Sequence, residues 1–407
     1  MSSKSWQERT EMNKLRIDEI IREMDAERDY VVSLRRFFHE NPELPREEFS
    51  TADRIEKELN SFGLETRRVD GTGVYAEIKG SGEGKTIILR ADIDALPVEE
   101  TNGCSFMSKK KGVMHACGHD AHTASLLLAA KILSKHKEEF KGIIKLCFQQ
   151  AEEIGYGAME FIKAGLVTGD RSFGIHLASN IPVGKVSATE GPNNASVDYF
   201  KITVKGRGAH VSTPEKGVDA LFVASSIVVS AQALVTRRTN PTDSVVIGIG
   251  KLEAGTAYNI VAKSAVLEGT IRVMYPEIRE KVKKELEDLS KSIASIYGAE
   301  AEIEYKDFTS PLINPHEPTE EVAKVAKKLL GDDNVITNRP YSLGGDDFAE
   351  FNLRVPGTYV YVGSGNDERP NTLVAHHDGL FEIDEDSLLI ASKLHVAYSL
   401  SFLENLI

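Results

Sequence analysis

Acidic and imidazole side chains follow the ends of four segments that we predict to be strands, and two further candidates open a predicted helix. In an open α/β sheet, ligands bind beyond the carboxyl ends of the strands, so side chains at these positions meet at one edge. Carboxylate, imidazole and thiol groups gathered at one edge form a typical donor set for metal ions. The candidates are Asp94 after TIILRADI, Glu152 and Glu153 after GIIKLCFQQ, His176 within SFGIHLA, His376 and His377 after GTYVYVGSG, and Cys117 and His119 within MHACGHDAH.

Each of these features has an ordinary structural explanation when it is taken alone. A lone histidine such as His176 is more often a core residue, adjacent glutamates often occupy a solvated turn, and Cys117 could be a buried thiol. The combination favours a metal site, because carboxylates at the exit of a buried strand are costly unless charge or metal compensates them. The candidates supply five donor residues, of the types Cys, His, Glu, His and His. One tetrahedral zinc ion takes only four ligands, whereas two metal ions that share a bridging ligand would use all five.

The adjacent residues Glu152 and Glu153 indicate a division of roles. Neighbouring side chains leave the backbone in different directions, so one carboxylate can bind metal while the other faces a water molecule. A metal ion lowers the pKa of its water toward 7, and a free carboxylate can then accept the proton. Asp94 suits a supporting role, in which it holds a ligand histidine through the other ring nitrogen.

The composition is that of an ordinary globular protein, and it excludes several function classes. The length of 407 residues favours two domains, and 41% of the residues are hydrophobic. The formal net charge of −13 would repel phosphate backbones, so nucleic acid is not an expected partner. We expect no membrane partner, because no apolar stretch approaches about 18 residues. The N-terminus lacks an apolar targeting region and there are only three cysteines, which favours a cytoplasmic protein.

Strands that alternate with helices predict an α/β domain whose mixed, largely parallel sheet is sandwiched by helices. The first two strands are separated by the glycine-rich turn GSGEGK, so we expect them to form a hairpin or meander. His39, His136, His316 and His395 lie on predicted helix faces or in polar loops, and we interpret them as surface or packing residues. The expected helices cover 13–40, 51–62, 122–136, 157–167, 319–331 and the C-terminus, and the expected strands cover 74–80, 86–94, 142–150, 172–178 and 357–365.

The pattern changes near residue 193. Strands alternate there with two helices in the order β-α-β-β-α-β, which is the ferredoxin-like arrangement of an α+β domain. We therefore predict a catalytic domain formed by residues 1–192 and 310–407, interrupted by an inserted domain over residues 193–309. The resemblance described below implies that this insertion is a lid and dimerisation domain. The expected elements of the insertion are strands over 198–206, 244–255, 265–275 and 299–308, and helices over 218–237 and 276–298.

Several motifs, found in order from residue 30 to the end of the chain, carry a resemblance to a known family. They are RADIDALPVEE at 90–100, MHACGHDAHTASLL at 114–127, QQAEEIGYGA at 149–158, GIHL at 174–177, GRGAHVSTP at 206–214, NIVAKSAVLEGTIR at 259–272, GGDDFAEF at 344–351 and HHDGLFEIDED at 376–386. In these motifs the chain resembles the dinuclear-metal aminoacylase and carboxypeptidase family of metallohydrolases, in the branch of hippurate hydrolase and the auxin-conjugate amidohydrolases that cleave IAA–amino acid conjugates.

The resemblance implies a site for two divalent metal ions, which could be Mn²⁺, Zn²⁺, Co²⁺ or Ni²⁺. Glu152 would be the general base and acid, and Asp94 would orient a ligand. His377 lies four residues before Phe381, as the family's spacing requires, whereas His376 is the alternative last ligand. The implied metal ligands are Cys117, which would bridge the two ions, and His119, Glu153, His176 and His377.

The resemblance also implies roles for three residues of the inserted domain. The inserted domains would pair in a homodimer, and His210 would stabilise the oxyanion in the neighbouring subunit's site. Asn259 and Arg272 would bind the substrate, through its carboxylate or its scissile carbonyl.

The reaction implied is metal-dependent hydrolysis of the amide bond of an N-acyl amino acid. A dipeptidase or carboxypeptidase acting on short peptides would use the same chemistry. Cys117 could instead act as a metal-free nucleophile with a nearby histidine. A catalytically silent homologue, kept as a binding protein, is a further alternative, but the intact Glu152 argues against it.

Overall fold

The structure is a computed structural model that describes residues 3–407, and it divides into two compact units. The first unit takes in the chain up to Gly191, together with Asn314–Pro340 and Glu350–Ile407. The second unit consists of Pro192–Ile313 and Tyr341–Ala349. The second unit therefore includes a short segment, Tyr341–Ala349, that lies outside the expected insertion.

The first unit is built on an eight-stranded mixed sheet, whose strands are β1 (Thr66–Val69), β2 (Gly73–Lys79), β3 (Thr86–Asp92), β4 (Ile143–Gln149), β5 (Arg171–Pro182), β6 (Val186–Ser187), β13 (Val335–Ile336) and β14 (Gly357–Gly365). Their spatial order is β1-β2-β4-β3-β5-β14-β6-β13. The central neighbours β4, β3, β5 and β14 run parallel, whereas β2 pairs antiparallel with β1 and β4, and β6 pairs antiparallel with β14. The expected mixed, largely parallel sheet is confirmed.

The expected hairpin between β2 and β3 is wrong, because β4 lies between these two strands. The glycine-rich turn that joins them bonds instead to the segment before β4. The N–H of Gly80 donates to the carbonyl of Gly142, and the N–H of Gly142 donates to the carbonyl of Gly82, both at 2.9 Å. A Cβ at Gly84 would lie 2.8 Å from the nitrogen of Gly142, so glycine permits this close approach of two backbones.

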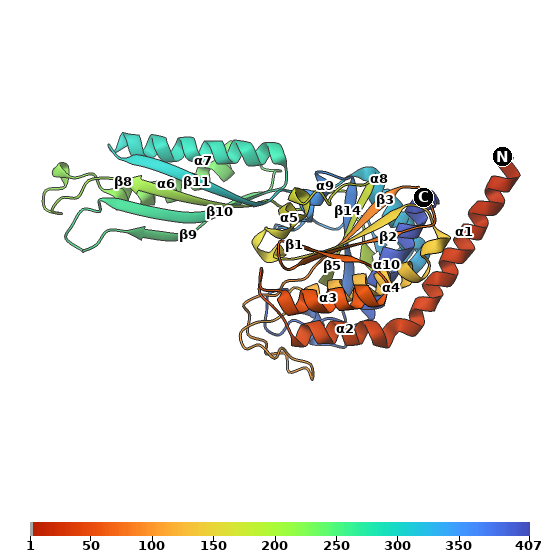
Figure 1. The fold of residues 1–407 in the computed structure, drawn as a ribbon. Helices are drawn as coiled ribbons and strands as arrows, with labels where there is room; N and C mark the ends of the chain where they lie inside the picture. The colour runs from red at the N-terminus through yellow and green to blue at the C-terminus, as the bar shows by residue number, and fades with distance from the viewer. Residues whose placement is uncertain (1–2) are drawn as a thin grey trace. The chain divides into compact units, whose positions relative to one another are not determined.

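Helices flank the sheet of the first unit, and they are α1 (Ser3–Glu23), α2 (Arg28–Glu40), α3 (Phe49–Ser61), α4 (His119–Lys135), α5 (Gly157–Lys163), α8 (His316–Leu330) and α10 (Asp386–Leu403). Figure 1 shows α2, α3 and α4 together on one side of the sheet. The single helix expected over 13–40 is wrong, because a 3₁₀ turn at Met24–Glu27 separates α1 from α2. Met24 is fully buried at this turn, and the chain bends there so that α1 contacts α10 while α2 contacts α4.

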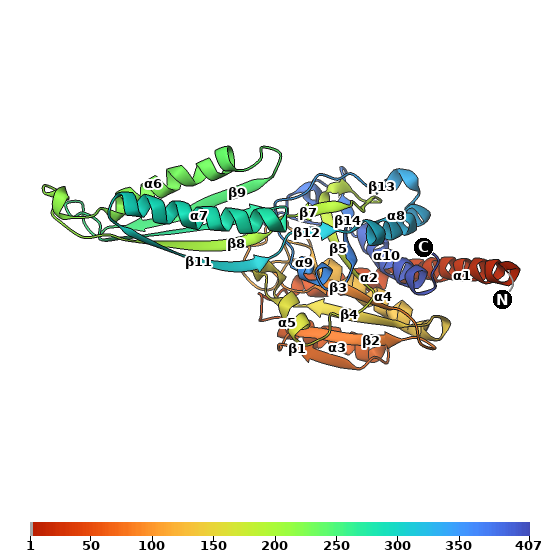
Figure 2. The ribbon, with the colours of Figure 1, turned by 90° about the horizontal axis from the view of Figure 1, so that it is seen from above.

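The second unit has the predicted ferredoxin-like order, with β8 (Val197–Lys205), α6 (Ala220–Ala233), β9 (Val245–Ala254), β10 (Ser264–Val273), α7 (Pro276–Ile296) and β11 (Glu300–Thr309). The strands form an antiparallel sheet in the order β11-β8-β10-β9. Both helices pack on the same face of this sheet (Figure 2), over a core that includes Phe200, Ile227 and Leu286. The short helix α9 (Phe348–Asn352) and the paired strands β7 (Gly191–Asn194) and β12 (Leu312–Asn314) lie where the chain passes between the units.

Helix α6 is unusually apolar. Together with the π turn that follows it, α6 forms a helical span over Ala220–Arg238 that could cross a membrane by length and composition, with a mean hydropathy of 1.5. The expectation that no segment approaches such apolarity is therefore wrong. The helix packs against α7 and the sheet, but only 33% of its apolar window is buried, and Leu221, Phe222 and Val229 are exposed.

Candidate metal centre

Parallel strands bring the acids and one imidazole of the candidate site together. Strands β3 and β4 pair in a register that sets Asp92 opposite Gln149. Asp94 and the 3₁₀ turn at Glu152–Ile154 therefore both follow directly beyond the same edge of the sheet. His176 lies in β5, which pairs with the other side of β3.

The start of α4 supplies Cys117 and His119. Gly118 stands between them with a φ of +86°, a left-handed conformation that glycine adopts without strain. The Sγ atom of Cys117 lies 3.5 Å from Nε2 of His176, so the turn and β5 meet at the site.

Asp94 lies against the ring of His119. Nδ1 of His119 lies 2.9 Å from the backbone oxygen of Asp94 and 3.3 Å from its carboxylate Oδ1. Because these oxygens can only accept, Nδ1 carries a proton and donates it. In the neutral ring, Nε2 then holds a lone pair, and it lies 3.9 Å from Oε1 of Glu153.

His176 is oriented in the same way by the backbone. Its Nδ1 lies 2.6 Å from the carbonyl oxygen of Leu177, so Nδ1 is the donor and Nε2 is the free lone pair. That lone pair is the atom that faces Cys117. Two histidines thus point nitrogen lone pairs toward the cluster while their other nitrogens are fixed by hydrogen bonds, which is the usual arrangement of metal-binding histidines.

His377 lies beside Glu153, whereas His376 lies beside His176. Nε2 of His377 is 3.5 Å from Oε1 of Glu153, and the backbone of His377 has a φ of +69° and donates to the carbonyl of Ala116 at 2.8 Å. The ring of His376 is 5.2 Å from that of His176. The loop therefore carries both histidines to the cluster, on different sides of it.

A left-handed turn presents the glutamate pair. Ala151, which precedes Glu152, has a φ of +54°. The Ala151 N–H donates to Oε1 of Glu48 at 2.9 Å, and the hydroxyl of Thr72 donates to Oε2 of the same carboxylate at 2.7 Å. Glu48 is fully buried, so the hydrogen bond that holds this turn is accepted by a carboxylate in the protein interior.

Burial favours the neutral forms of most donors. It raises the pKa of Glu153 to about 7 against the opposing effect of His119, and it raises the pKa of the Cys117 thiol well above its ordinary value, with Glu153 adding to the shift. Burial and the neighbouring His122 lower the pKa of His176. For His119, burial alone would lower the pKa, but Asp92 and Cys117 outweigh it and hold the pKa high. A bound cation would compensate the thiolate and the carboxylate.

The donor set fits two metal ions. Nε2 of His119 and Oε1 of Glu153 are buried polar atoms without a hydrogen-bond partner among residues 3–407, which is costly for an interior atom. The ligand atoms of Cys117, His119 and His176 lie within 4.8 Å of one another, and so do those of Cys117, Glu153 and His377. Cys117 belongs to both groups, which is the position of a bridging ligand.

Asp92 and His122 support the cluster, and together with Glu48 they are not among the site residues predicted from the sequence. Nδ1 of His122 donates to Oδ1 of Asp92 at 2.6 Å, because Nε2 of His122 accepts the N–H of Leu177 at 2.9 Å. His122 therefore fixes the backbone beside His176 and is not available as a ligand. The motifs contained Asp92 and His122, but the spacing did not show that they pair across 30 positions.

The remaining predicted site residues, His210, Asn259 and Arg272, belong to the second unit. His210 is exposed, and its Nδ1 accepts from the hydroxyl of Ser212 at 2.7 Å. The segments around His210 and Asn259 pair, with the N–H of Val211 donating to the carbonyl of Asn259 at 3.1 Å. Arg272 lies half-buried on β10, and burial lowers its pKa. The structure thus brings His210 and Asn259 into one loop pair, and their roles toward the metal cluster stay predictions.

Comparison with known proteins finds one family and many relatives. Residues 88–401 match the sequence profile of the peptidase family M20/M25/M40. Thermostable carboxypeptidase 2 of Saccharolobus solfataricus is 39% identical over 380 residues, which cover 92% of this chain and 95% of that protein. The N-acetyl-L-cysteine deacetylase of Bacillus subtilis is 39% identical over 364 residues, which cover 89% of this chain and 85% of that protein.

A solved structure has the same fold. It is the crystal structure of a Bacillus subtilis protein described as a dinuclear metal-binding peptidase of the M20 family. Its TM-score is 0.82 at 33% sequence identity, and the match covers 93% of this chain and 99% of that one. The cluster of candidate ligands described above therefore lies on a fold shared with a protein that is described as binding two metals.

Proposed function

Because this chain belongs to the peptidase family M20/M25/M40, we propose that it is a metal-dependent amidohydrolase that cleaves N-acyl amino acids into a carboxylic acid and an amino acid. Its relatives are hydrolases of amide bonds, including a deacetylase of N-acetyl-L-cysteine and a carboxypeptidase. The observation that carries the proposal is the position of Cys117 in two ligand groups, beside the adjacent pair Glu152 and Glu153.

Two divalent metal ions, when bound, would polarise the scissile carbonyl and lower the pKa of a water molecule. Glu152 accepts the proton of that water and returns it to the leaving nitrogen, so that one carboxylate serves as base and then as acid. The ligand atoms of Glu152, Glu153 and His119 lie within 4.8 Å of one another, which supports this position for Glu152. The buried carboxylate of Glu48 holds the turn before Glu152 and so fixes the direction of the base.

The ligands proposed are Cys117, His119, Glu153, His176 and His377. The contact between His377 and Glu153 favours His377 over His376 as the last ligand. Mixed sulfur, nitrogen and oxygen ligation is compatible with Zn²⁺, Mn²⁺, Co²⁺ and Ni²⁺, and metal supply often decides among them.

A homodimer through the second unit is part of the proposal. Leu221, Phe222 and Val229 on α6 are exposed, and β9 is an edge strand of the antiparallel sheet. Exposed apolar residues and open strand edges are features that pair with another chain. In such a dimer, His210 would reach the partner's site and donate a hydrogen bond to the oxyanion, with Asn259 and Arg272 binding the substrate.

The substrate proposed is a small N-acyl amino acid, and the compartment proposed is the cytoplasm. Hydrolysis of short peptides is the second candidate, because one relative is named a carboxypeptidase. Neither reaction needs nucleic acid or a membrane.

A hydrolysis screen on metal-loaded protein tests the proposal. N-acetyl, N-benzoyl and N-indolylacetyl amino acids would be compared with dipeptides and tripeptides, before and after treatment with a chelator. We expect hydrolysis of N-acyl amino acids that the chelator abolishes. Activity that survives chelation but is lost on thiol alkylation would instead support Cys117 as a nucleophile, and cleavage of peptides alone would support the second candidate.

A further inference from the structure

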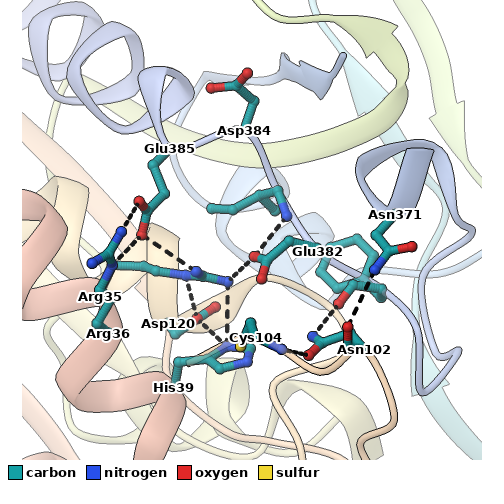
Figure 3. Close-up of polar contacts among 12 residues, drawn as sticks. Arg35, Arg36, His39, Asn102, Cys104, Asp120, Asn371, Glu382, Asp384 and Glu385 are labelled. Atoms are coloured by element: carbon teal, nitrogen blue, oxygen red, sulfur yellow. Dashed lines mark hydrogen bonds and ion pairs between the residues drawn. The ribbon is translucent and has the colours of Figure 1, made fainter. Parts of the chain in front are cut away.

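A second group of metal-binding side chains lies in the first unit, outside the dinuclear centre. It consists of His39 on α2 and of Glu100 and Cys104 in the loop between β3 and α4. His39 and Glu100 are buried, and Cys104 is half-buried. Figure 3 shows the thiol of Cys104 beside the ring of His39. None of these residues has a part in the proposed hydrolysis.

The ring of His39 is held in the manner of a metal ligand. Its Nδ1 lies 2.7 Å from Oδ2 of Asp120, and the same oxygen accepts from Nε of Arg35 at 2.9 Å. Both partners of His39 on this side are fully buried, so the ring cannot turn. A carboxylate on one ring nitrogen fixes the other nitrogen for a metal ion, as in carboxylate–histidine–zinc arrangements.

Three different donor atoms converge on the free side of this ring. Nε2 of His39 lies 2.9 Å from Oε1 of Glu100, and Sγ of Cys104 lies 3.8 Å from that oxygen. All three atoms lie within 4.8 Å of one another. Zinc–ligand bond lengths place the ligands of one tetrahedral ion about 3.3–3.8 Å apart, so the existing distances require only small adjustments.

The charge of the cluster also suits a divalent cation. With His39 protonated, the proton on Nε2 bridges to Glu100, and the Cys104 thiol holds a second proton. A divalent ion that replaces both protons leaves the net charge of the three side chains unchanged. The neighbouring pairs of Arg35 with Asp120 and Glu382 therefore stay balanced in the interior.

The loop that carries Cys104 is both ordered and open. Oδ1 of Asn102 accepts the N–H of Cys104 at 3.0 Å, and Nδ2 of Asn102 donates to the carbonyl of Phe381 at 3.1 Å. Figure 3 shows the contact of Asn102 with Cys104, beside His39. Thr101, Gly103 and Ser105 are exposed, so an ion can reach the thiol from solvent. The fourth ligand position would be taken by water.

From this geometry we infer that His39, Glu100 and Cys104 form a third metal site, which binds ions of the zinc type that favour a thiolate ligand. The site differs from the dinuclear centre in having a single sulfur donor that no other ion shares. Mn²⁺, which prefers oxygen ligands, should not fill it.

A titration with Cd²⁺ on the full-length protein, freed of metal and then loaded with Cd²⁺ alone, tests the inference. Cd²⁺ reports thiolate bonds by ultraviolet charge-transfer absorption. Wild-type protein should bind three Cd²⁺ per chain, and Cys104→Ser should bind two and lose the thiolate absorption of one site. Cys117→Ser should keep the absorption that belongs to Cys104, which separates the two centres.

The matched control moves the thiol by one residue. The double variant Cys104→Ser/Ser105→Cys has the same number of thiols, with the new one at an exposed position. It should also bind only two Cd²⁺. Wild-type protein that saturates at two ions, or a third ion that persists in Cys104→Ser, would overturn the inference.

Alkylation provides a second measurement that does not depend on a variant. Protein loaded with Mn²⁺ is treated with iodoacetamide with and without Zn²⁺, and the modified cysteine is identified by peptide mass spectrometry. Zn²⁺ should slow the alkylation of Cys104 at least about tenfold, because a metal-bound thiolate reacts poorly. An unchanged rate for Cys104 in the presence of Zn²⁺ would contradict the site.

Discussion

The carboxylate of Glu48 accepts the backbone N–H of Ala151 at 2.9 Å, across 103 positions of the chain. Ala151 has a left-handed backbone, and the residue that follows it is the proposed base, Glu152. An alanine in this conformation persists only when its surroundings fix it. Glu48 is the buried group that does so.

Glu48→Ala should lower both stability and turnover, whereas Glu48→Gln should lower them little. The alanine variant leaves the Ala151 N–H buried without an acceptor, which costs about 1–3 kcal/mol. The glutamine oxygen can still accept this N–H. Chemical unfolding and kcat, measured for both variants, check the prediction, and equal losses in both would contradict it.

A comparison of wild type with Glu48→Gln should also show a pH dependence of stability. Burial raises the pKa of Glu48 to about 7, with Asp94 adding to the shift, from an ordinary value of 4.5. The folded state therefore binds this proton more tightly than the unfolded state, and stability falls as pH rises from about 4.5 to about 7. The free energy of unfolding of wild type, relative to Glu48→Gln, should fall over this window by up to about 3 kcal/mol. A constant difference between pH 4.5 and pH 8 would refute it.

Glu152→Gln should retain metal and fold but lose about 10²–10⁴-fold in kcat, because an amide cannot accept the proton of water. Circular dichroism and metal analysis establish that the variant is intact. Near-normal turnover would remove Glu152 from the role of base.

Loading with Mn²⁺ alone should stop at two ions per chain, because the five donors of the main cluster supply two sites. Removing the ions with a chelator should abolish hydrolysis, and adding Mn²⁺ should restore it. Elemental analysis measures the ratio. A ratio that never exceeds one, combined with full activity of Cys117→Ala, would contradict the dinuclear centre.

Arg35→Met should destabilise the protein by about 3–5 kcal/mol, because it removes the arginine that pairs with the buried charge of Asp120 and leaves only His39 beside it. Arg36→Met is the matched control, since Arg36 makes an exposed pair with Glu385 and should cost about 0–1 kcal/mol. Thermal or urea unfolding of the two variants checks the difference. Similar values for both would mean that the interior pair contributes no more than a surface pair.

A mixture of inactive Glu152→Gln chains and inactive His210→Ala chains should recover activity if dimers share sites. A mixed dimer has one site with an intact base and an intact histidine from the other chain. Random exchange makes about half of the dimers mixed, so recovery should approach about a quarter of wild type. Absence of recovery, with exchange shown by differential labelling, would place His210 in its own chain's site or outside catalysis.

The grouping of the candidate ligands could be predicted from sequence because parallel strands end at a common edge of the sheet. Asp94, His176 and the glutamate pair each follow or lie within an apolar strand, and no knowledge of distant contacts was needed to group them. The alternation of elements likewise predicted the inserted ferredoxin-like domain.

Contacts between distant segments could not be predicted. The support of Ala151 by Glu48 joins two loops with no shared pattern, and His39 looked like a packing residue because its partners Asp120 and Glu100 lie far along the chain. The position of β4 between β2 and β3 was not predicted for the same reason. The sequence GSGEGK favours a turn whether or not the two strands that it joins pair with each other. The local sequence determines that a turn forms, whereas the pairing of the flanking strands depends on the other strands of the sheet.

The first turn of α4 has a consequence for protein engineering. His119 belongs to the proposed dinuclear centre, while the next residue, Asp120, is fixed by Arg35 and His39 of α2. Grafting the nine-residue segment MHACGHDAH onto another scaffold would transfer two metal ligands together with an acid that needs its own cationic receptor. A transplant that omits α2 would bury an unpaired carboxylate one residue from a ligand. The smallest portable module is therefore this segment together with the helix that neutralises it.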